Sequence, residues 1–346
     1  MIGLMTSGGI GLLVAVLATP ALLRWLAKRR IGQQIREDGP SMHHAKAGTP
    51  TMGGLAILVA IAAGYVAGHI ATHVAFTADG LLIVMAAVGF GVIGFLDDWI
   101  KVRHRRSLGL NKRAKFSFQI IVAVVFALGA EHLGAANTHL SFTRWDSFGV
   151  DLGTLGWVLW AVFVMVGTSN AVNLTDGLDG LASGSATFCF AVLAIIGYWQ
   201  FRHVSIYHIA GASALDLALA SVALAGACLG FLWWNAAPAR IFMGDTGSLA
   251  IGSGLAALSL LMNVHILLAV IGGLFVIVTF SVVIQVVSYR VFGRRVFRMA
   301  PLHHHFELIG WPETTVIVRF WILAGLFAAL GLGIFYADFL SASNLN

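Results

Sequence analysis

Residues 80–98 read GLLIVMAAVGFGVIGFLDD, an unbroken apolar run that ends in two aspartates. A helix needs about 20 mostly apolar residues to cross the hydrocarbon core of a bilayer. Because lipid offers the backbone no hydrogen-bond partners, such a run is expected to be helical throughout. The stretch therefore predicts a membrane-spanning helix with two carboxylates at one end.

The composition of the whole chain also indicates a membrane protein. Of its 346 residues, 59% are hydrophobic and only 10% are charged, and the mean hydropathy is +0.89. A soluble domain carries about 25% charged residues, so this chain has too few to cover a water-facing surface. Cys189 and Cys228 lie in apolar runs, which indicates buried side chains and neither a disulfide nor a thiolate metal site. We expect one integral membrane domain over residues 1–346 and no nucleic-acid partner.

Ten apolar segments are long enough to span the bilayer, which predicts an all-α polytopic protein. The expected spans are 6–27, 52–73, 79–96, 116–133, 154–173, 181–200, 212–233, 246–263, 265–288 and 316–338. In the first segment the positive charges follow the apolar run and no small-residue cleavage site closes it. We therefore interpret it as a membrane span and not as a secretory signal.

The basic residues predict how these spans are oriented. Lys and Arg are enriched in cytoplasmic loops. If the N-terminus is outside, all of the 21 Lys and Arg residues except Arg144 and Arg202 fall on the cytoplasmic side. The expected cytoplasmic segments are 28–51, 97–115, 174–180, 234–245 and 289–315. Both termini are therefore predicted to be periplasmic, in a multi-pass inner-membrane protein.

Nearly all clustered Asp, Asn and His residues lie in or beside these cytoplasmic segments. Ionisable groups near a membrane core are costly and usually functional, and a transporter is expected to place some near the midplane of its helices. Here the midplanes are apolar. The pattern favours an enzyme with its active site in a cytoplasmic-side cleft, and it disfavours a His-rich cation transporter. Segment 134–153 predicts a turn-rich surface hairpin or short helix without chemistry.

Asp97 and Asp98 form the first candidate cluster, followed by Lys101. Adjacent carboxylates repel each other unless a cation or a proton lies between them. The pair therefore predicts a Mg²⁺ site, or a base beside a phosphate site. The alternative is a solvated helix end with interfacial charges.

Residues 169–180, SNAVNLTDGLDG, form the second cluster. Asn170, Asn173, Asp176 and Asp179 recur every three residues, a spacing that brings neighbours close together on a helix. A helix cap would explain one or two of them. Four exceed that need, and their oxygens suit a nucleoside, a sugar or a hard cation.

Residues 233–248, WWNAAPARIFMGDTGS, contain the third cluster. The glycines around Asp245 could expose backbone N–H groups to a phosphate at a helix N-terminus, and Asp245 could bind Mg²⁺ there. Phe242 offers an aromatic face for a base. A glycine-containing turn capped by Asp245 is the alternative.

Residues 298–315, RMAPLHHHFELIGWPETT, carry three consecutive histidines between two prolines. We expect a loop, because His303, His304 and His305 cannot all point the same way on a helix. Zn²⁺ ligation lacks supporting cysteines or an HExxH spacing. Hydrogen bonds to phosphate or sugar groups fit equally well, and a histidine there could act as acid or base.

Residues 41–54, SMHHAKAGTPTMGG, supply a charge on Lys46 and hydroxyls on Thr49 and Thr51. Lysine is a point-charge phosphate binder, although basic loops also arise from topology alone. Together the five segments describe a Mg²⁺-assisted phosphate site, in which the protein mostly positions groups and neutralises charge.

The motifs GTPTMGG, NLTDGLDGLA, FMGDTGSLA and MAPLHHHFELIGWPE, in this order, resemble the polyprenyl-phosphate N-acetylhexosamine-1-phosphate transferase superfamily. Within it they look like the bacterial phospho-N-acetylmuramoyl-pentapeptide transferases, over about Lys46 to Trp321. The resemblance implies ten helices, a Mg²⁺ cofactor and a homodimer in the bacterial inner membrane. It also implies transfer from UDP-MurNAc-pentapeptide to undecaprenyl phosphate, giving lipid I and UMP in the first membrane step of peptidoglycan synthesis.

The resemblance also assigns roles to residues. Asp245 matches the family's metal ligand, and Asp97 and Asp98 match its essential aspartate pair. The predicted catalytic residues are thus Asp97, Asp98, Asp245, His303 and His304. The predicted substrate-binding residues are Lys46, Thr51, Lys101, Asn170, Asn173, Asp176, Asp179, Asn235, Phe242 and His305, among which Lys101, Phe242 and Asp179 look like the uridine-binding set.

Two questions stay open from the sequence. Direct attack of the lipid phosphate on the UDP-sugar, with Asp98 as base, is the favoured hypothesis over a covalent aspartyl intermediate. A sister transferase that uses UDP-GlcNAc is the alternative function, and it should differ chiefly in the histidine segment.

Overall fold

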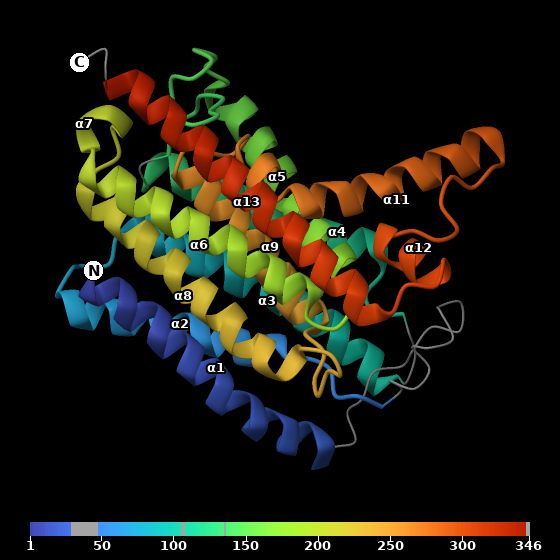
Figure 1. Ribbon diagram of the computed structural model, residues 1–346. Coiled ribbons are helices and arrows are strands. Elements are labelled where there is room, and N and C mark those ends of the chain that lie inside the picture. Colours follow the sequence, from blue (N-terminus) through green and yellow to red (C-terminus); the bar gives the residue numbers. More distant parts are fainter. Residues whose placement is uncertain (29–47, 105–107, 135, 344–346) are drawn as a thin grey trace.

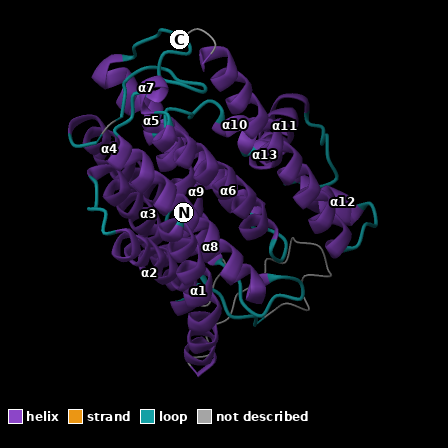
Figure 2. Ribbon diagram, turned by 60° about the vertical axis from the view of Figure 1, so that its left-hand side comes forward, coloured by secondary structure: helices purple, strands orange, loops and turns teal. Residues whose placement is uncertain are grey.

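The computed structural model describes residues 1–28, 48–104, 108–134 and 136–343. Over these residues the regular elements are helices, apart from one isolated antiparallel bridge between His139 and Asp151. Figure 2 shows this all-helical architecture. The predicted all-α class is confirmed.

Thirteen helices are present in the described ranges: α1 (Ile2–Lys28), α2 (Gly54–Thr72), α3 (Ala78–Arg103), α4 (Lys112–His132), α5 (Gly153–Thr175), α6 (Leu181–Arg202), α7 (Val204–Tyr207), α8 (Gly211–Asn235), α9 (Gly244–Leu261), α10 (Leu268–Ile271), α11 (Gly273–Phe292), α12 (Leu302–Leu308) and α13 (Glu313–Ser343). Within those ranges nine are long and apolar enough to cross a membrane, namely α1–α6, α8, α11 and α13. The chain is therefore a multi-pass membrane protein.

Ten spans were expected and nine candidates are found in the described residues; helix α9 accounts for the difference. It coincides with expected span 246–263, but glycine, serine and Asp245 make it less apolar than the other long helices. Its residues from Thr246 to Leu261 are all buried, and it lies among α3, α5 and α2 (Figure 1). A helix that other helices shield from lipid does not need an apolar surface, because its packing depends on close approach.

The expected span 265–288 is wrong at its start. The chain instead forms the single turn α10, breaks at Gly272 and then begins α11 at Gly273. A Cβ at position 273 would lie 2.5 Å from the ring of Phe327 in α13, so the two helices approach closely at this glycine pair. Paired small residues are a common site of sharp bends, and beyond this bend α11 extends away from the helical bundle (Figure 1).

Residues 136–153 form a hairpin, one of the two structures expected for segment 134–153. The backbone N–H of Leu140 donates to Val150 O, and that of Leu152 donates to Thr138 O. Arg144 anchors the hairpin to α13 through an ion pair with Asp338, with 2.9 Å between Nε and Oδ2.

Two glycines bring the ends of α2, α3 and α9 together. A Cβ at Gly54 would lie 2.1 Å from the backbone nitrogen of Gly247, and one at Gly94 would lie 2.2 Å from the carbonyl oxygen of Asp245. Any larger side chain would push the helices apart. This close approach places the start of α9 against the end of α3.

Candidate active site

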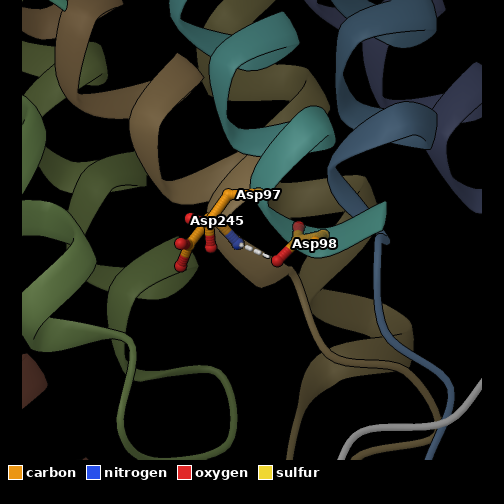
Figure 3. Close-up of side chains that lie close together, drawn as sticks. All are labelled: Asp97, Asp98 and Asp245. Atoms are coloured by element: carbon orange, nitrogen blue, oxygen red, sulfur yellow. Dashed lines mark hydrogen bonds between the residues drawn. The ribbon is translucent and has the colours of Figure 1, made fainter. Parts of the chain in front are cut away.

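Three carboxylates meet where α3 ends and α9 begins. Asp97 and Asp98 come from the last turns of α3, and Asp245 comes from the first turn of α9. One oxygen from each lies within 4.8 Å of the others (Figure 3). Asp97 and Asp98 are each 3% exposed. Such a group of charges is stable only if cations or N–H donors balance it.

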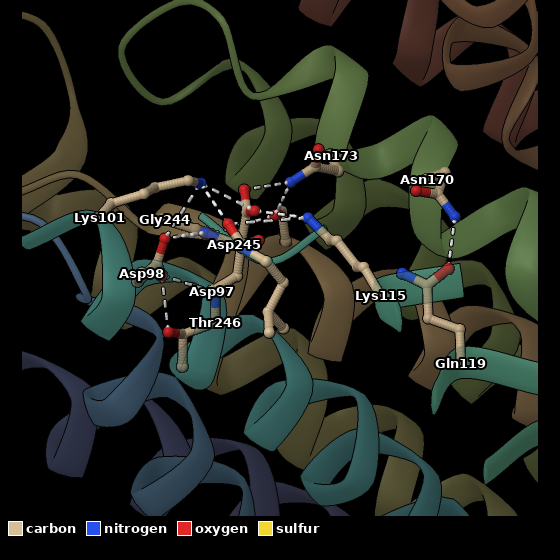
Figure 4. Close-up of polar contacts among 12 residues, drawn as sticks. Asp97, Asp98, Lys101, Lys115, Gln119, Asn170, Asn173, Gly244, Asp245 and Thr246 are labelled. Atoms are coloured by element: carbon tan, nitrogen blue, oxygen red, sulfur yellow. Dashed lines mark hydrogen bonds and ion pairs between the residues drawn. The ribbon is translucent and has the colours of Figure 1, made fainter. Parts of the chain in front are cut away.

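Two lysines provide much of that balance. The ammonium nitrogen of Lys101 lies 2.5 Å from Asp97 Oδ2 and 3.0 Å from Asp245 Oδ2, and that of Lys115 lies 2.5 Å from Asp245 Oδ2 (Figure 4). The two positive charges leave the cluster with one net negative charge when all three aspartates are ionised. The cluster therefore keeps an attraction for a further cation.

Asp98 differs from its neighbours because it caps α9. Its Oδ1 accepts a hydrogen bond from the backbone N–H of Asp245, and its Oδ2 accepts from the N–H and the hydroxyl of Thr246. A carboxylate at a helix N-terminus is stabilised by the unpaired N–H groups and the helix dipole. Asp98 thus fixes the position of Asp245.

Helix α5 adds amides to the cluster. Asn173 donates from Nδ2 to Asp245 Oδ1 at 2.8 Å and to Ser248 Oγ at 2.8 Å. Asn170, one turn earlier, instead faces α4 and donates to Gln119 Oε1. The predicted series of Asn and Asp residues therefore does not act as one group. Of these two asparagines, only Asn173 contacts the carboxylates directly.

The segment before α2 is tied to the segment before α9. Backbone hydrogen bonds join Phe242 N to Pro50 O, and Gly53 N to Phe242 O. Thr51 is buried, at 6% exposure, beside Gly244. This pairing places Thr51 next to the acidic cluster and leaves Phe242 partly exposed. Lys46 lies outside the described residues.

Asp179 and Asn235 hold loops together in the described chain. Asp179 accepts from Ala239 N, and Asn235 accepts from Gly180 N and donates to Ile241 O. Both side chains are at least 96% buried. Their contacts therefore connect the DGLDG turn (residues 176–180) to the segment that precedes α9. At the same turn, Glu313 accepts a hydrogen bond from the backbone N–H of Asp179.

Asp176 lies at the end of α5, on the same turn. Desolvation raises the pKa of this carboxyl, and the nearby carboxylates of Asp245 and Asp98 raise it further. A bound cation would oppose this effect and favour the ionised form.

The histidine segment was expected to be a loop, and this was wrong: it forms the short helix α12. As predicted, the three histidines point in different directions. A Cβ at Gly177 would lie 2.3 Å from His303 Nε2, so His303 packs on the DGLDG turn. His304 pairs through Nδ1 with Glu307 Oε2 at 2.6 Å. His305 accepts from the backbone N–H of Arg298 and so faces the preceding loop.

Comparison with known proteins identifies the family. The family model of glycosyl transferase family 4 matches residues 80–263. The chain is 51% identical to the phospho-N-acetylmuramoyl-pentapeptide-transferase of Frankia casuarinae, over 99% of both chains. It is 49% identical to that of Streptomyces avermitilis, over 96% of both. It is 48% identical to that of Thermobifida fusca, over 98% of this chain and 99% of the relative.

The chain belongs to the phospho-N-acetylmuramoyl-pentapeptide-transferases of glycosyl transferase family 4. A signature of these transferases also matches residues 46–58, which include the GTPTMGG motif. The predicted family is therefore confirmed, and membership in this transferase family argues against a cation transporter.

Three polar residues of this transferase were missed from the sequence. Lys115 lies in the first turn of α4, where several basic residues follow one another, so the pattern did not distinguish it from charges set by topology. Glu307 carried a signal, because it follows His304 by three residues and can pair with it on a helix. Gln119 carried none, since a single polar residue in an apolar span has many structural explanations.

Proposed function

We propose that this transferase moves phospho-MurNAc-pentapeptide from UDP-MurNAc-pentapeptide to undecaprenyl phosphate, giving lipid I and UMP. The observation that carries the proposal is the convergence of three aspartates and two lysines at one end of the bundle, in a chain about half identical to named transferases of this kind. Phosphoryl transfer needs mainly positioning and charge neutralisation, and such a cluster can supply both.

The residues of the cluster fit a Mg²⁺ ion. Their carboxylate oxygens are hard donors, and Mg²⁺ in phosphate sites is typically held by one or two carboxylates. Asp245 would hold the ion with Asp97, because Asp97 Oδ2 and Asp245 Oδ2 both face the ammonium group of Lys101, which an ion could replace, whereas both oxygens of Asp98 accept hydrogen bonds from the start of α9. When bound, the ion would neutralise charge on the phosphates. Lys101 and Lys115, which pair with Asp245 in this structure, could then bind the same phosphates in place of the carboxylate.

In the proposed reaction an oxygen of the lipid phosphate attacks the sugar-bearing phosphorus of the UDP-sugar. The new P–O bond forms as the bridging P–O bond to UMP breaks, and the electron pair leaves with UMP. A phosphate monoester has a second pKa of about 6, so most of it is already deprotonated at neutral pH. No base is then required, and we assign Asp98 to positioning α9 in place of the base role expected from the sequence.

The pair of His304 and Glu307 is proposed to orient His304 toward the substrate phosphates. Glu307 fixes Nδ1 of His304, which leaves Nε2 to face the DGLDG turn beside Gly177. We expect Glu307→Gln to lower kcat by about tenfold, as the loss of an orienting carboxylate does at other sites, with little change in either KM. The control is Glu131→Gln, which removes a carboxylate that bonds Thr154 near the far end of α4. An unchanged kcat in Glu307→Gln would show that the pair has only a structural role.

The test of the function is UMP release by purified protein in detergent. Release should require UDP-MurNAc-pentapeptide, undecaprenyl phosphate and Mg²⁺ together, and chelation of the metal should stop it. The alternative donor is UDP-GlcNAc, and turnover with it alone would move the protein to the sister transferases. No turnover with either donor in folded protein would refute the proposal.

We further propose that α9 serves as the tenth span, that both termini are periplasmic and that the active-site cleft faces the cytoplasm. The distribution of Lys and Arg supports this orientation. In spheroplasts, an impermeant maleimide should label Phe148→Cys in the hairpin and leave Lys112→Cys unlabelled until the membrane is permeabilised. Both positions are exposed, and the two native cysteines are buried. Labelling in the opposite order would invert the topology. Homodimer formation stays a prediction from the family resemblance.

A further inference from the structure

Gln119 of α4 and Asn170 of α5 form a polar pair one helical turn further into the bundle than the acidic cluster. Asn170 Nδ2 donates to Gln119 Oε1 at 2.9 Å. Gln119 follows Lys115 by four residues and Asn170 precedes Asn173 by three, so each lies on the same helix face as a residue that contacts Asp245. The pair thus continues the polar row that begins at the cluster (Figure 4).

The hydrogen bonds fix which way both amides point. Asn170 Nδ2 also donates to the backbone carbonyl of Val166 at 2.8 Å, and a flipped Asn170 would place two carbonyl oxygens against each other. Because Asn170 presents its nitrogen as a donor, the Gln119 atom that faces it must be the acceptor, its carbonyl oxygen. The orientation of Gln119 is therefore determined by its neighbours.

This orientation leaves the amide nitrogen of Gln119 without a hydrogen-bond partner in the described part of the chain. The Gln119 side chain is buried, at 1% exposure, and buried N–H donors without partners are rare and unfavourable in native proteins. Figure 4 shows this nitrogen turned to the side of Lys115 and Asp245, and away from Asn170. The donor is thus available to a ligand that also reaches the cluster.

The ligand has to offer an acceptor oxygen close to the ammonium group of Lys115. A phosphate meets this requirement, since its oxygens accept from ammonium and amide groups alike. Two phosphates enter the proposed reaction, that of the lipid and the pyrophosphate of the nucleotide. The position of Gln119 favours the lipid. Along α4 it is flanked by Phe116, Phe118 and Ile121, which are exposed on the outer surface of the helix, so apolar surface suited to a lipid chain lies beside it.

We propose that the amide nitrogen of Gln119 binds a phosphate oxygen of the polyprenyl phosphate acceptor, next to Lys115. This inference rests on the proposed transferase function and adds a residue that selects the acceptor. Asn170 then acts as a positioning residue that holds the Gln119 amide in the orientation that donates.

Steady-state kinetics of Gln119→Leu and Gln119→Glu provide the test. Loss of a hydrogen bond to a charged group should raise the KM for undecaprenyl phosphate about tenfold in Gln119→Leu. Gln119→Glu should raise it further, because it places a carboxylate against the phosphate. The KM for the UDP-sugar should stay within about twofold of the wild type. A rise confined to the UDP-sugar KM, or a fall in kcat with both KM values unchanged, would overturn the proposal.

Gln200→Leu is the matched control. Gln200 is also a buried amide near the far end of α6. Its nitrogen donates to Met262 O, and its oxygen has no hydrogen-bond partner among the residues that the structure describes. Its replacement should leave the lipid KM unchanged, and an equal rise there would mean that the effect is general to buried amides.

Binding without turnover separates this inference from the function itself. Native mass spectrometry can count undecaprenyl phosphate on wild-type protein and on Gln119→Leu in the absence of any UDP-sugar. Lower occupancy in the variant would support the subsite even if the wild type proved inactive as a transferase. Equal occupancy in the two proteins would overturn it.

Discussion

Replacing Asp245 by asparagine is expected to lower the rate of UMP release by about a thousandfold. Asp245 contacts both lysines and Asn173 and is the proposed metal ligand. Metal-ion charge stabilisation contributes several kcal/mol to a transition state, and each factor of ten in rate corresponds to about 1.4 kcal/mol. Asparagine keeps the size of the side chain but removes the charge, so the loss should appear in kcat.

Asp146→Asn serves as the control for Asp245→Asn. It removes a carboxylate from the hairpin, where Asp146 is 44% exposed and pairs only loosely with Arg144, at 3.7 Å. Its rate should match the wild type. A folded Asp245→Asn protein that kept more than about a tenth of the wild-type rate would contradict the proposed role of Asp245.

Asp98→Asn is expected to lower kcat by about a hundredfold and also to lower the melting temperature. Both oxygens of Asp98 accept hydrogen bonds from the start of α9, and an amide would present N–H groups to at least one of those donors. Each lost hydrogen bond to a buried charged group costs about 1.5–3 kcal/mol of stability. Without these bonds the start of α9 should shift and displace Asp245 relative to Asp97. Activity and thermal stability in detergent measure the two effects.

Thr246→Val distinguishes positioning by Asp98 from a role as base. Valine removes the hydroxyl that donates to Asp98 but leaves the carboxylate free to take a proton. If Asp98 positions α9, Thr246→Val should have about a tenth of the wild-type rate and should also be less stable. If Thr246→Val retains full activity while Asp98→Asn is inactive, the positioning role is wrong.

Much of the architecture could be predicted because the membrane imposes simple rules. Apolar length set the positions of the helices, and runs such as 80–96 carried no competing signal. Helix α9 coincides with the expected span 246–263 although it is less apolar than the nine candidate spans in the described residues, since burial by other helices replaces contact with lipid. The break at Gly272 was missed because an apolar run shows no sign of where it bends.

The site could be predicted only where its residues cluster in sequence. The aspartate pair, the DGLDG turn and Asp245 each stood out, and the structure brings Asp97, Asp98 and Asp245 together. Lys115 and Gln119 could not be found this way, because what distinguishes them is the helix that they face. The separation of Asn170 from the carboxylates has the same cause, since sequence spacing does not show how α4 packs on α5.

Whether the three-aspartate cluster holds a metal ion can be tested by counting bound Mn²⁺, as a probe for Mg²⁺, by electron paramagnetic resonance on purified protein. We expect one Mn²⁺ ion per chain in the wild type, which Mg²⁺ displaces. This site should be lost in Asp245→Asn and kept in Asp146→Asn. Equal binding of Mn²⁺ by wild type and Asp245→Asn would show that the three-aspartate cluster does not hold the metal.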